Sequence, residues 1–251
     1  MTLPDRLPIV VIACQVFQSL LERHMPAGMA QEINFLDYGL HRVPTNLNWT
    51  VQQAIDEIEE PSLVVLGYGL CGNGLKDIKA GKHTLLIPRA DDCIAILLGS
   101  YQDYIHEFET SPGTYYLTKG WLESGSNPLK EYLEYKEKYG EESAMWIMDQ
   151  QYQHYKRLVF VAHSDDDLRD YRAAALEVAE FCKRWDMVYE ERLGSEGYVK
   201  RLVEVAKVLG NPPKKSRTKT EYQSANRQDQ AGDDFIVVRP GGELRQSQFI
   251  R

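Results

Sequence analysis

Short apolar runs alternate with segments of helical period along most of this 251-residue chain. The runs are mostly rich in Val, Ile and Leu, and a short uninterrupted run of this kind is typical of a strand that is covered on both faces. They cover residues 9–13, 33–36, 63–66, 84–87 and 158–162, with a weaker strand expected at 187–190 and a late one at 235–238. Between them, apolar residues recur at helical spacing. The alternation predicts an α/β fold with three layers, in which a mostly parallel sheet carries helices on both faces.

Two stretches break this alternation. Residues 111–156 contain no clear strand and are crowded with Tyr, Trp, Glu and Lys; Pro128 follows Ser126 and Asn127, as a proline does in the first turn of a helix. We interpret the stretch as a helical insertion that caps the sheet. Residues 211–233 hold almost no apolar side chain, so we expect a flexible linker. The whole chain, residues 1–251, is otherwise interpreted as a single α/β domain.

Composition narrows the class of protein. The formal net charge of -8 gives no overall field that would attract nucleic acid or an anionic membrane. No apolar run approaches the roughly 18 residues of a membrane helix, and we expect no signal peptide, because only a very short apolar run follows the acidic and proline residues at the start. Four cysteines are too few for a disulfide scaffold in a chain of this length. We therefore expect a cytoplasmic protein that acts on a small molecule, with no nucleic-acid or membrane partner.

Three of the four cysteines follow predicted strands. Cys14, Cys71 and Cys93 come after the first, third and fourth strands, and His41 and His163 follow the second and fifth. The carboxyl ends of parallel strands meet at one edge, where open α/β sheets bind their ligands. We therefore expect the three thiols to converge. The alternative is three separate buried cysteines, because cysteine is a common core residue and no C-x-x-C spacing is present.

Cys93 has a second feature that bears on reactivity. Asp91 or Asp92 can cap a helix that begins at this cysteine, and a thiol in the first turn of a helix lies near unpaired backbone N–H groups. That position favours a thiolate, which Arg89 would support and the two aspartates would oppose. Alternatively, Cys93 is an ordinary small helix residue. Arg89 is also a candidate to anchor an anionic group of the substrate.

The stretch LGYGLCGNGL contains the spacing G-x-G-x-x-G at Gly67, Gly69 and Gly72. A dinucleotide-binding loop with this spacing follows the first strand and precedes a long helix. Here it follows the third strand, and only a short segment separates it from Gly81. We favour a ligand loop, in which glycines let the backbone pass close to a bound group while Cys71 is presented to it. The dinucleotide loop is the alternative.

Each of the remaining candidate residues has a structural role as the alternative to a functional one. His41 and His163 are either metal ligands or acid–base groups, or histidines satisfied by the surrounding protein. Trp121 either packs within the expected cap or stacks on a ligand. Cys182 lies on the apolar stripe of its predicted helix, and we assign it to packing.

Five pieces of the sequence resemble an uncharacterised family, the domain of unknown function sixteen thirty-eight: IACQVF, DYGLH, LGYGLCGNGL, PRADDCIAILLGS and PGTYYLTKGW. The resemblance extends over most of residues 9–205. It implies a bacterial or archaeal α/β protein without an agreed activity. Such proteins are associated with corrinoid-dependent methyl transfer, so the resemblance also implies a corrinoid protein or a methyltransferase as a possible partner.

Together these features predict a metal-dependent enzyme with a cysteine-rich site at the carboxyl edge of the sheet. Three thiolates suit zinc and would also hold an iron–sulfur cluster. The expected reaction is methyl transfer to or from sulfur. Two alternatives remain open: a protein that binds a corrinoid or another cofactor without turnover, and a metal-free enzyme with a cysteine nucleophile.

Overall fold

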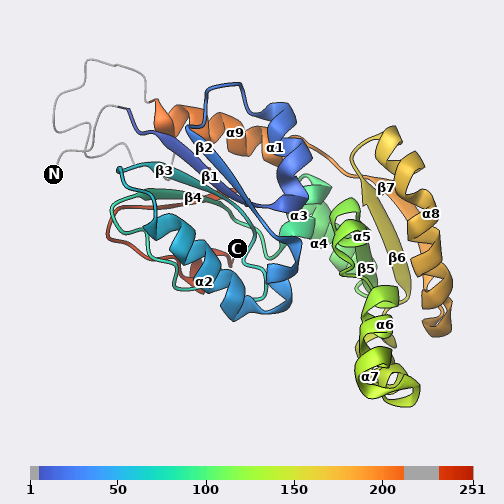
Figure 1. Ribbon diagram of the computed structural model, residues 1–251. Coiled ribbons are helices and arrows are strands. Elements are labelled where there is room, and N and C mark those ends of the chain that lie inside the picture. Colours follow the sequence, from blue (N-terminus) through green and yellow to red (C-terminus); the bar gives the residue numbers. More distant parts are fainter. Residues whose placement is uncertain (1–5, 212–231, 251) are drawn as a thin grey trace. The chain divides into compact units, whose positions relative to one another are not determined.

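The computed structural model describes residues 6–211 and 232–250 (Figure 1). The predicted linker at 211–233 therefore lies almost wholly outside the described residues. All seven predicted strands are present, together with one that the sequence analysis missed. They form two separate sheets rather than one. No helix in the described part of the chain combines the length and the apolar character needed to cross a membrane.

The larger sheet has five strands in the order β2-β1-β3-β4-β8. Strands β1 to β4 are parallel, and β8 runs antiparallel to β4. Every residue of β1, β3 and β4 is buried, as their uninterrupted apolar runs predict. The strands are β1 (Ile9–Cys14), β2 (Glu32–Leu36), β3 (Leu63–Gly67), β4 (Thr84–Pro88) and β8 (Phe235–Val238).

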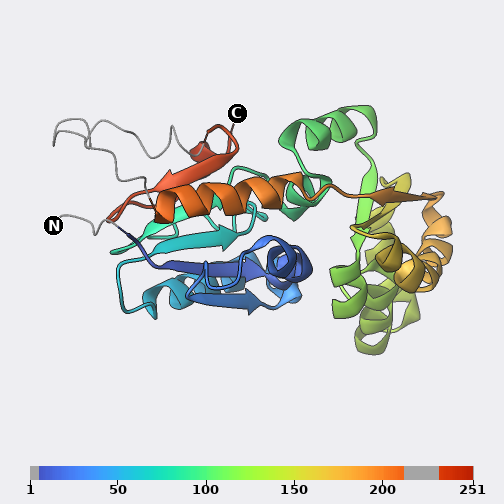
Figure 2. The same cartoon turned by 90° about the horizontal axis from the view of Figure 1, so that it is seen from above.

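Helices cover both faces of this sheet. Helices α1 (Gln18–His24) and α9 (Gly197–Gly210) lie side by side on one face, and α2 (Pro44–Asp56) lies on the other (Figures 1 and 2). Helix α2 begins with a proline, whose missing N–H costs nothing in a first turn, and it buries Leu47, Val51 and Ile55 completely. The predicted three-layer α/β fold is confirmed. Shorter elements are η1 (Gln15–Phe17), η2 (Tyr38–Arg42), α3 (Cys93–Leu98) and η4 (Gln246–Gln248).

The smaller sheet has three parallel strands in the order β5-β6-β7: β5 (Thr114–Thr118), β6 (Arg157–Ala162) and β7 (Val188–Leu193). Leu158, Phe160 and Ala162 point to one face and share a core with side chains of the helices. Strand β5 lies inside the stretch that we expected to be helical. The helices are α4 (Tyr101–Thr110), α5 (Lys119–Ser124), α6 (Pro128–Tyr139), α7 (Glu141–Tyr152) and α8 (Asp165–Cys182), followed by η3 (Lys183–Trp185).

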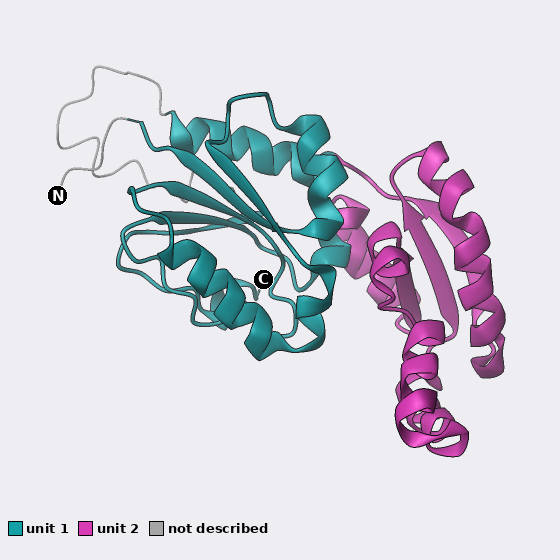
Figure 3. Ribbon diagram, viewed as in Figure 1, with its two compact units in different colours: residues 1–96, 197–251 teal, residues 97–196 magenta. Residues whose placement is uncertain are grey.

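The chain divides into two compact units (Figure 3). Unit 1 comprises Met1–Ile96 and Gly197–Arg251 and contains the five-stranded sheet; unit 2 is Leu97–Glu196 and contains the three-stranded sheet. This division differs from the single domain with an insertion at 111–156 that the sequence suggested. The inserted segment is longer, and it has a sheet and a core of its own.

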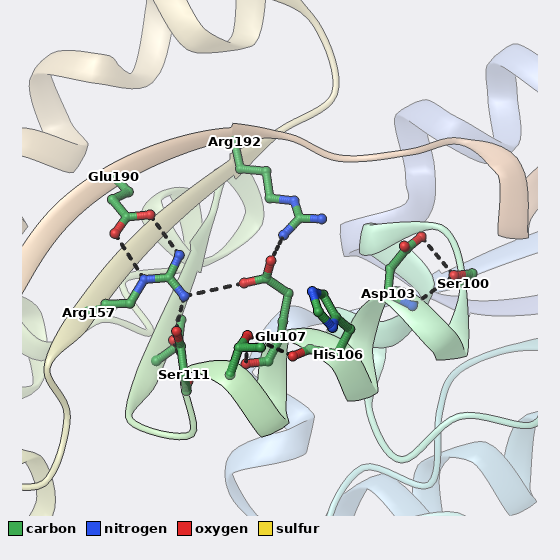
Figure 4. Close-up of polar contacts among 10 residues, drawn as sticks. Ser100, Asp103, His106, Glu107, Ser111, Arg157, Glu190 and Arg192 are labelled. Atoms are coloured by element: carbon green, nitrogen blue, oxygen red, sulfur yellow. Dashed lines mark hydrogen bonds and ion pairs between the residues drawn. The ribbon is translucent and has the colours of Figure 1, made fainter.

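Unit 2 carries a network of ion pairs on the face of its sheet that Arg157 occupies (Figure 4). Glu107 of α4 pairs with Arg157 of β6 and with Arg192 of β7. Arg157 also pairs with Glu190 at 2.7 Å. Because successive residues of a strand point to opposite faces, Arg157 lies away from the core that Leu158 enters.

A candidate thiol site at the carboxyl edge of the five-stranded sheet

The strand order of unit 1 contains a switch point at a defined position. From β1 the chain continues to β2 on one side, whereas β3 pairs with β1 on the other side. In open α/β sheets this reversal creates a switch point, and ligands bind there, outside the carboxyl ends of the strands. Cys14 is the last residue of β1, and Gly67 is the last residue of β3. Cys14 and the loop after Gly67 therefore flank the switch point.

Two glycines allow the close approach of the chain segments at this edge. A Cβ atom on Gly67 would lie 2.5 Å from the Cβ of Ala13, so only glycine fits beside β1. A Cβ atom on Gly69 would lie 2.7 Å from the Cα of Asp92, directly before α3. The amides of Leu70 and Cys71 donate to the carbonyls of residues 90 and 91, each at 2.9 Å. These contacts join the loop after β3 to the segment that carries Cys93.

The loop holds Cys71 in an unusual backbone conformation. The φ angles of Cys71, Gly72 and Asn73 are 48°, 62° and 72°, so three consecutive residues are left-handed. A residue with a Cβ atom pays on the order of 1 kcal/mol for this conformation. The turn is closed by the Gly74 amide, which donates to the carbonyl of Cys71 at 3.1 Å. Strain of this kind tends to persist where it fixes a functional side chain.

The three predicted thiols lie in one cluster. The sulfur atoms of Cys71 and Cys93 are 3.6 Å apart, and the thiol of Cys93 is also hydrogen-bonded to that of Cys14. Two sulfurs bound to one tetrahedral zinc at about 2.3 Å would lie roughly 3.8 Å apart. The observed separation is close to that value and much longer than the roughly 2.05 Å of a disulfide bond. Among the residues that the structure describes, no group of three or more His, Cys, Asp and Glu side chains is already arranged to hold a metal ion.

The pKa values of Cys14 and Cys93 are shifted in opposite directions. The pKa of Cys14 is lowered, chiefly by the hydrogen bond from Cys93, although burial opposes the shift. The pKa of Cys93 is raised, because its hydrogen bonds with Cys14 and Cys71 favour the protonated thiol and because it is buried. Thiolate character is therefore favoured on Cys14. The position of Cys93 at a helix start suggested the opposite, but α3 is short and its first amides are capped by Asp92, which accepts from Ile94 at 2.8 Å.

Tyr68 is a further member of this site that the sequence analysis did not single out. Its side chain is only 2% exposed, and within the described residues its hydroxyl has no hydrogen-bond partner. Burial raises the pKa of Tyr68, and the charges of the three cysteines and of Asp37 raise it further. The phenol is therefore close to the thiols and remains protonated. The available signal was its position, directly after β3 and inside the glycine loop.

The other two candidate residues in unit 1, His41 and Arg89, contact backbone carbonyl groups. His41 lies in η2, and its Nδ1 is 2.6 Å from the carbonyl oxygen of Tyr38. Arg89 follows β4; its backbone amide donates to the carbonyl of Asp234 at 2.8 Å, and its guanidinium donates to the carbonyl of Ile250. The structure thus ties Arg89 to the C-terminal segment of the described chain.

His163, Trp121 and Cys182 belong to unit 2. His163 follows β6 of the three-stranded sheet, and its Nε2 is 3.0 Å from the carbonyl of Leu97, so the single sheet edge that grouped it with the cysteines does not exist. Trp121 is half-buried in α5 and packs against the core of unit 2. Cys182 is completely buried in that core, and burial raises its pKa to about 12. Its environment is that of a packing residue.

The structure does not supply the parts of a dinucleotide loop. Between β3 and β4, all of which is described, the chain forms turns and no helix. A dinucleotide loop needs a helix N-terminus behind the glycines to face the pyrophosphate. Gly67 and Gly69 are instead explained by close contacts within the protein, and Gly72 by its left-handed backbone.

The fold and this edge define an α/β protein with a cysteine cluster at the switch point of its larger sheet. A family model described as "Protein of unknown function (DUF1638)" matches residues 35–203, and the chain belongs to this family. The matched residues include Cys71 and Cys93 but not Cys14. No curated protein and no solved structure matches the chain.

Proposed function

We propose that Cys14, Cys71 and Cys93 form a zinc centre of a small-molecule enzyme, which transfers a methyl group to or from sulfur. The observation that carries the proposal is the convergence of three thiols from three separate strand ends at the switch point of the sheet. A protein core has no need for this grouping, since a buried cysteine can pack alone, as Cys182 does.

The ligand set suits zinc. Three protein ligands and one open position are the usual arrangement of a catalytic zinc site, and thiolates are preferred ligands of this borderline metal. Zinc binds thiols in their deprotonated form, so each ligand must lose its proton. The lowered pKa of Cys14 favours this loss. Rotation of the cysteine side chains would be needed to direct all three sulfurs to one point.

The chemistry follows from the open position. When bound, zinc would act as a Lewis acid and lower the pKa of a substrate thiol. In methyl transfer to sulfur, the new S–C bond forms at the substrate thiolate. The bond between the donor and the methyl group breaks, and its electron pair stays on the donor, for which a corrinoid protein is the proposed partner. His41 is a proposed fourth group at the site and Arg89 a proposed anchor for an anionic part of the substrate.

Cys93 is less well supported as a metal-free nucleophile. A nucleophilic cysteine needs a lowered pKa or an adjacent base, whereas the pKa of Cys93 is raised by its neighbours and by burial. The histidine contacts described above, of His41 with Tyr38 and of His163 with Leu97, are to backbone carbonyls.

Metal analysis tests the proposal directly. The protein would be purified without oxygen, and its metal content and absorption spectrum would be measured before and after titration with zinc. We expect one zinc per chain and no band in the visible region. A brown protein with bound iron would indicate an iron–sulfur cluster, and a red one a corrinoid. Protein that contains no metal and binds no added zinc would refute the zinc centre.

A further inference from the structure

The hydroxyl of Tyr68 is a hydrogen-bond donor that is buried near the thiol cluster, with no acceptor in the described part of the chain. The side chain is 2% exposed, and its oxygen has no partner among the described residues. Buried hydroxyl groups nearly always have a partner, because an unsatisfied donor loses its bonds to water and gains nothing in return. An exception at the end of a strand that flanks the switch point indicates that the missing acceptor is supplied by a ligand.

The neighbouring protein groups do not fill this role. The three thiols are engaged with one another, and sulfur is in any case a weak acceptor. Asp37 also lies near, since its charge acts on the phenol, but its carboxylate accepts from the Gly39 amide at 2.7 Å. What the phenol lacks is a strong acceptor, and in small-molecule ligands that is most often an oxygen atom.

We propose that Tyr68 donates a hydrogen bond to an oxygen atom of the ligand that binds at the thiol cluster. The substrate would then carry an oxygen acceptor, such as a carboxylate or a carbonyl, next to the atom that meets the metal. This inference rests on the proposed metal centre and adds the ligand class to it. Tyr68 would then make the site bind oxygen-bearing ligands more tightly than simple thiols.

The test compares two probes on the protein loaded with cobalt(II), whose visible bands report the coordination of a thiolate site. Acetohydroxamate presents oxygen acceptors, whereas ethanethiol presents none. Both would be titrated into wild type, Tyr68→Phe and the control Tyr139→Phe, which removes the same atom from an exposed tyrosine of unit 2. We expect Tyr68→Phe to weaken acetohydroxamate binding about ten-fold or more and ethanethiol binding about two-fold or less. Tyr139→Phe should behave as wild type.

The outcomes separate this inference from the proposed function. Wild type that takes up no cobalt would refute the metal centre and this inference with it. If wild type and Tyr68→Phe both take up cobalt, and both bind acetohydroxamate equally well or neither binds it, the inference is overturned. The proposed metal centre would remain supported. Because the hydroxyl has no partner among the residues that the structure describes, the cobalt-free Tyr68→Phe variant should melt at or above the temperature of wild type. Failure of that variant to fold would show that the hydroxyl is already satisfied, and would also overturn the inference.

Discussion

Each of the two units partly buries a cluster of polar side chains, but the two clusters are satisfied to different degrees. In unit 2, Glu107 is 17% exposed and lies between Arg157 and Arg192, and Arg157 has Glu190 as a second partner (Figure 4). In unit 1, three thiols donate and accept among themselves, and the Tyr68 hydroxyl beside them has no partner within the described residues.

This difference separates a structural network from a candidate site. Opposite charges that meet in pairs hold helix and sheet together and leave little capacity to bind anything else. Thiols that face one another contribute little to stability. At Cys71 they are also accompanied by backbone strain. Such an arrangement is unfavourable for stability alone, so its presence at a switch point is better explained by a ligand that completes it.

The largest expected effect comes from removing one thiol of the unit 1 cluster. Cys71→Ser should lower zinc affinity by at least about a hundred-fold, because a serine hydroxyl does not ionise near neutral pH and is a poor ligand for a borderline metal. The fold should survive. Zinc content and competition with a chromophoric chelator measure the effect, with circular dichroism as the check on folding.

Cys182→Ala is the matched control for this experiment, because it removes a thiol from unit 2 and should leave zinc binding unchanged. A different result would restore the dinucleotide loop. If wild type binds no metal, is stabilised by a nucleotide, and Cys71→Ser behaves identically, the glycines rather than the thiol are the functional part of this loop.

The next largest effect concerns the contact that brings Cys71 to Cys93. In Gly69→Val the new side chain would meet the backbone of Asp92, whose Cα lies 2.7 Å from the position of the Cβ atom. We expect the free energy of unfolding to fall by about 3 kcal/mol, together with loss of zinc, since backbone cannot give way as a flexible side chain can. Urea unfolding measures the first quantity. The control is Gly81→Ala, where nothing lies within 4 Å and only the left-handed backbone, with φ of 54°, should cost about 1 kcal/mol.

Much of unit 1 was predictable from the sequence because its strands are buried on both faces. An uninterrupted apolar run such as LVVLG indicates a strand buried on both faces. Parallel strands bring their carboxyl ends to one edge, which is why Cys14, Cys71 and Cys93 were selected together. Strand β5 was missed because TYYLT places two tyrosines in a half-buried strand, where β propensity is high but hydropathy is not.

The division into two units and the membership of the site were harder to predict. The run at 158–162 looks like those of the larger sheet, and nothing local reveals that β6 pairs with β5 and β7 instead. His163 was therefore grouped with the cysteines at one sheet edge, whereas its strand belongs to the smaller sheet. Tyr68 was missed for a related reason: whether a hydroxyl finds a partner depends on side chains far away in the sequence.

The ion-pair network of unit 2 should contribute to stability and not to binding. Glu107→Gln removes the charge that lies between two arginines, and we expect the free energy of unfolding to fall by about 2 kcal/mol, because the groups are partly buried. Zinc affinity should not change. The control is Glu180→Gln, since Glu180 forms an exposed pair with Lys183 within one helix turn, and its loss should cost at most about 0.5 kcal/mol. Equal costs for the two variants would remove the distinction between a structural network and surface pairs.

The smallest effect sharpens the contrast between Cys182 and the clustered thiols. Cys182→Ala removes a completely buried sulfur and should lower the free energy of unfolding by about 1 kcal/mol at neutral pH. Burial raises the pKa of Cys182 from 9.0 to about 12, so the folded state holds this proton more tightly than the unfolded state does. The resulting contribution to stability is complete below about pH 9 and is lost as the pH rises toward 12, by about 1.4 kcal/mol per pH unit.

The variant has no thiol at this position and escapes that loss, whereas the other tyrosines, lysines and cysteines titrate alike in both proteins and cancel in the difference. Beyond pH 9, wild type loses about 1.4 kcal/mol of its free energy of unfolding per pH unit, which exceeds its initial advantage within one unit. The stability advantage of wild type over the variant should therefore vanish by about pH 10 and reverse above it. Urea unfolding at pH 7, 9, 10 and about 10.5 measures the difference. A constant difference across this range would show that Cys182 ionises as easily when folded as when unfolded, and its environment would then not be the apolar counterpart of the thiol cluster.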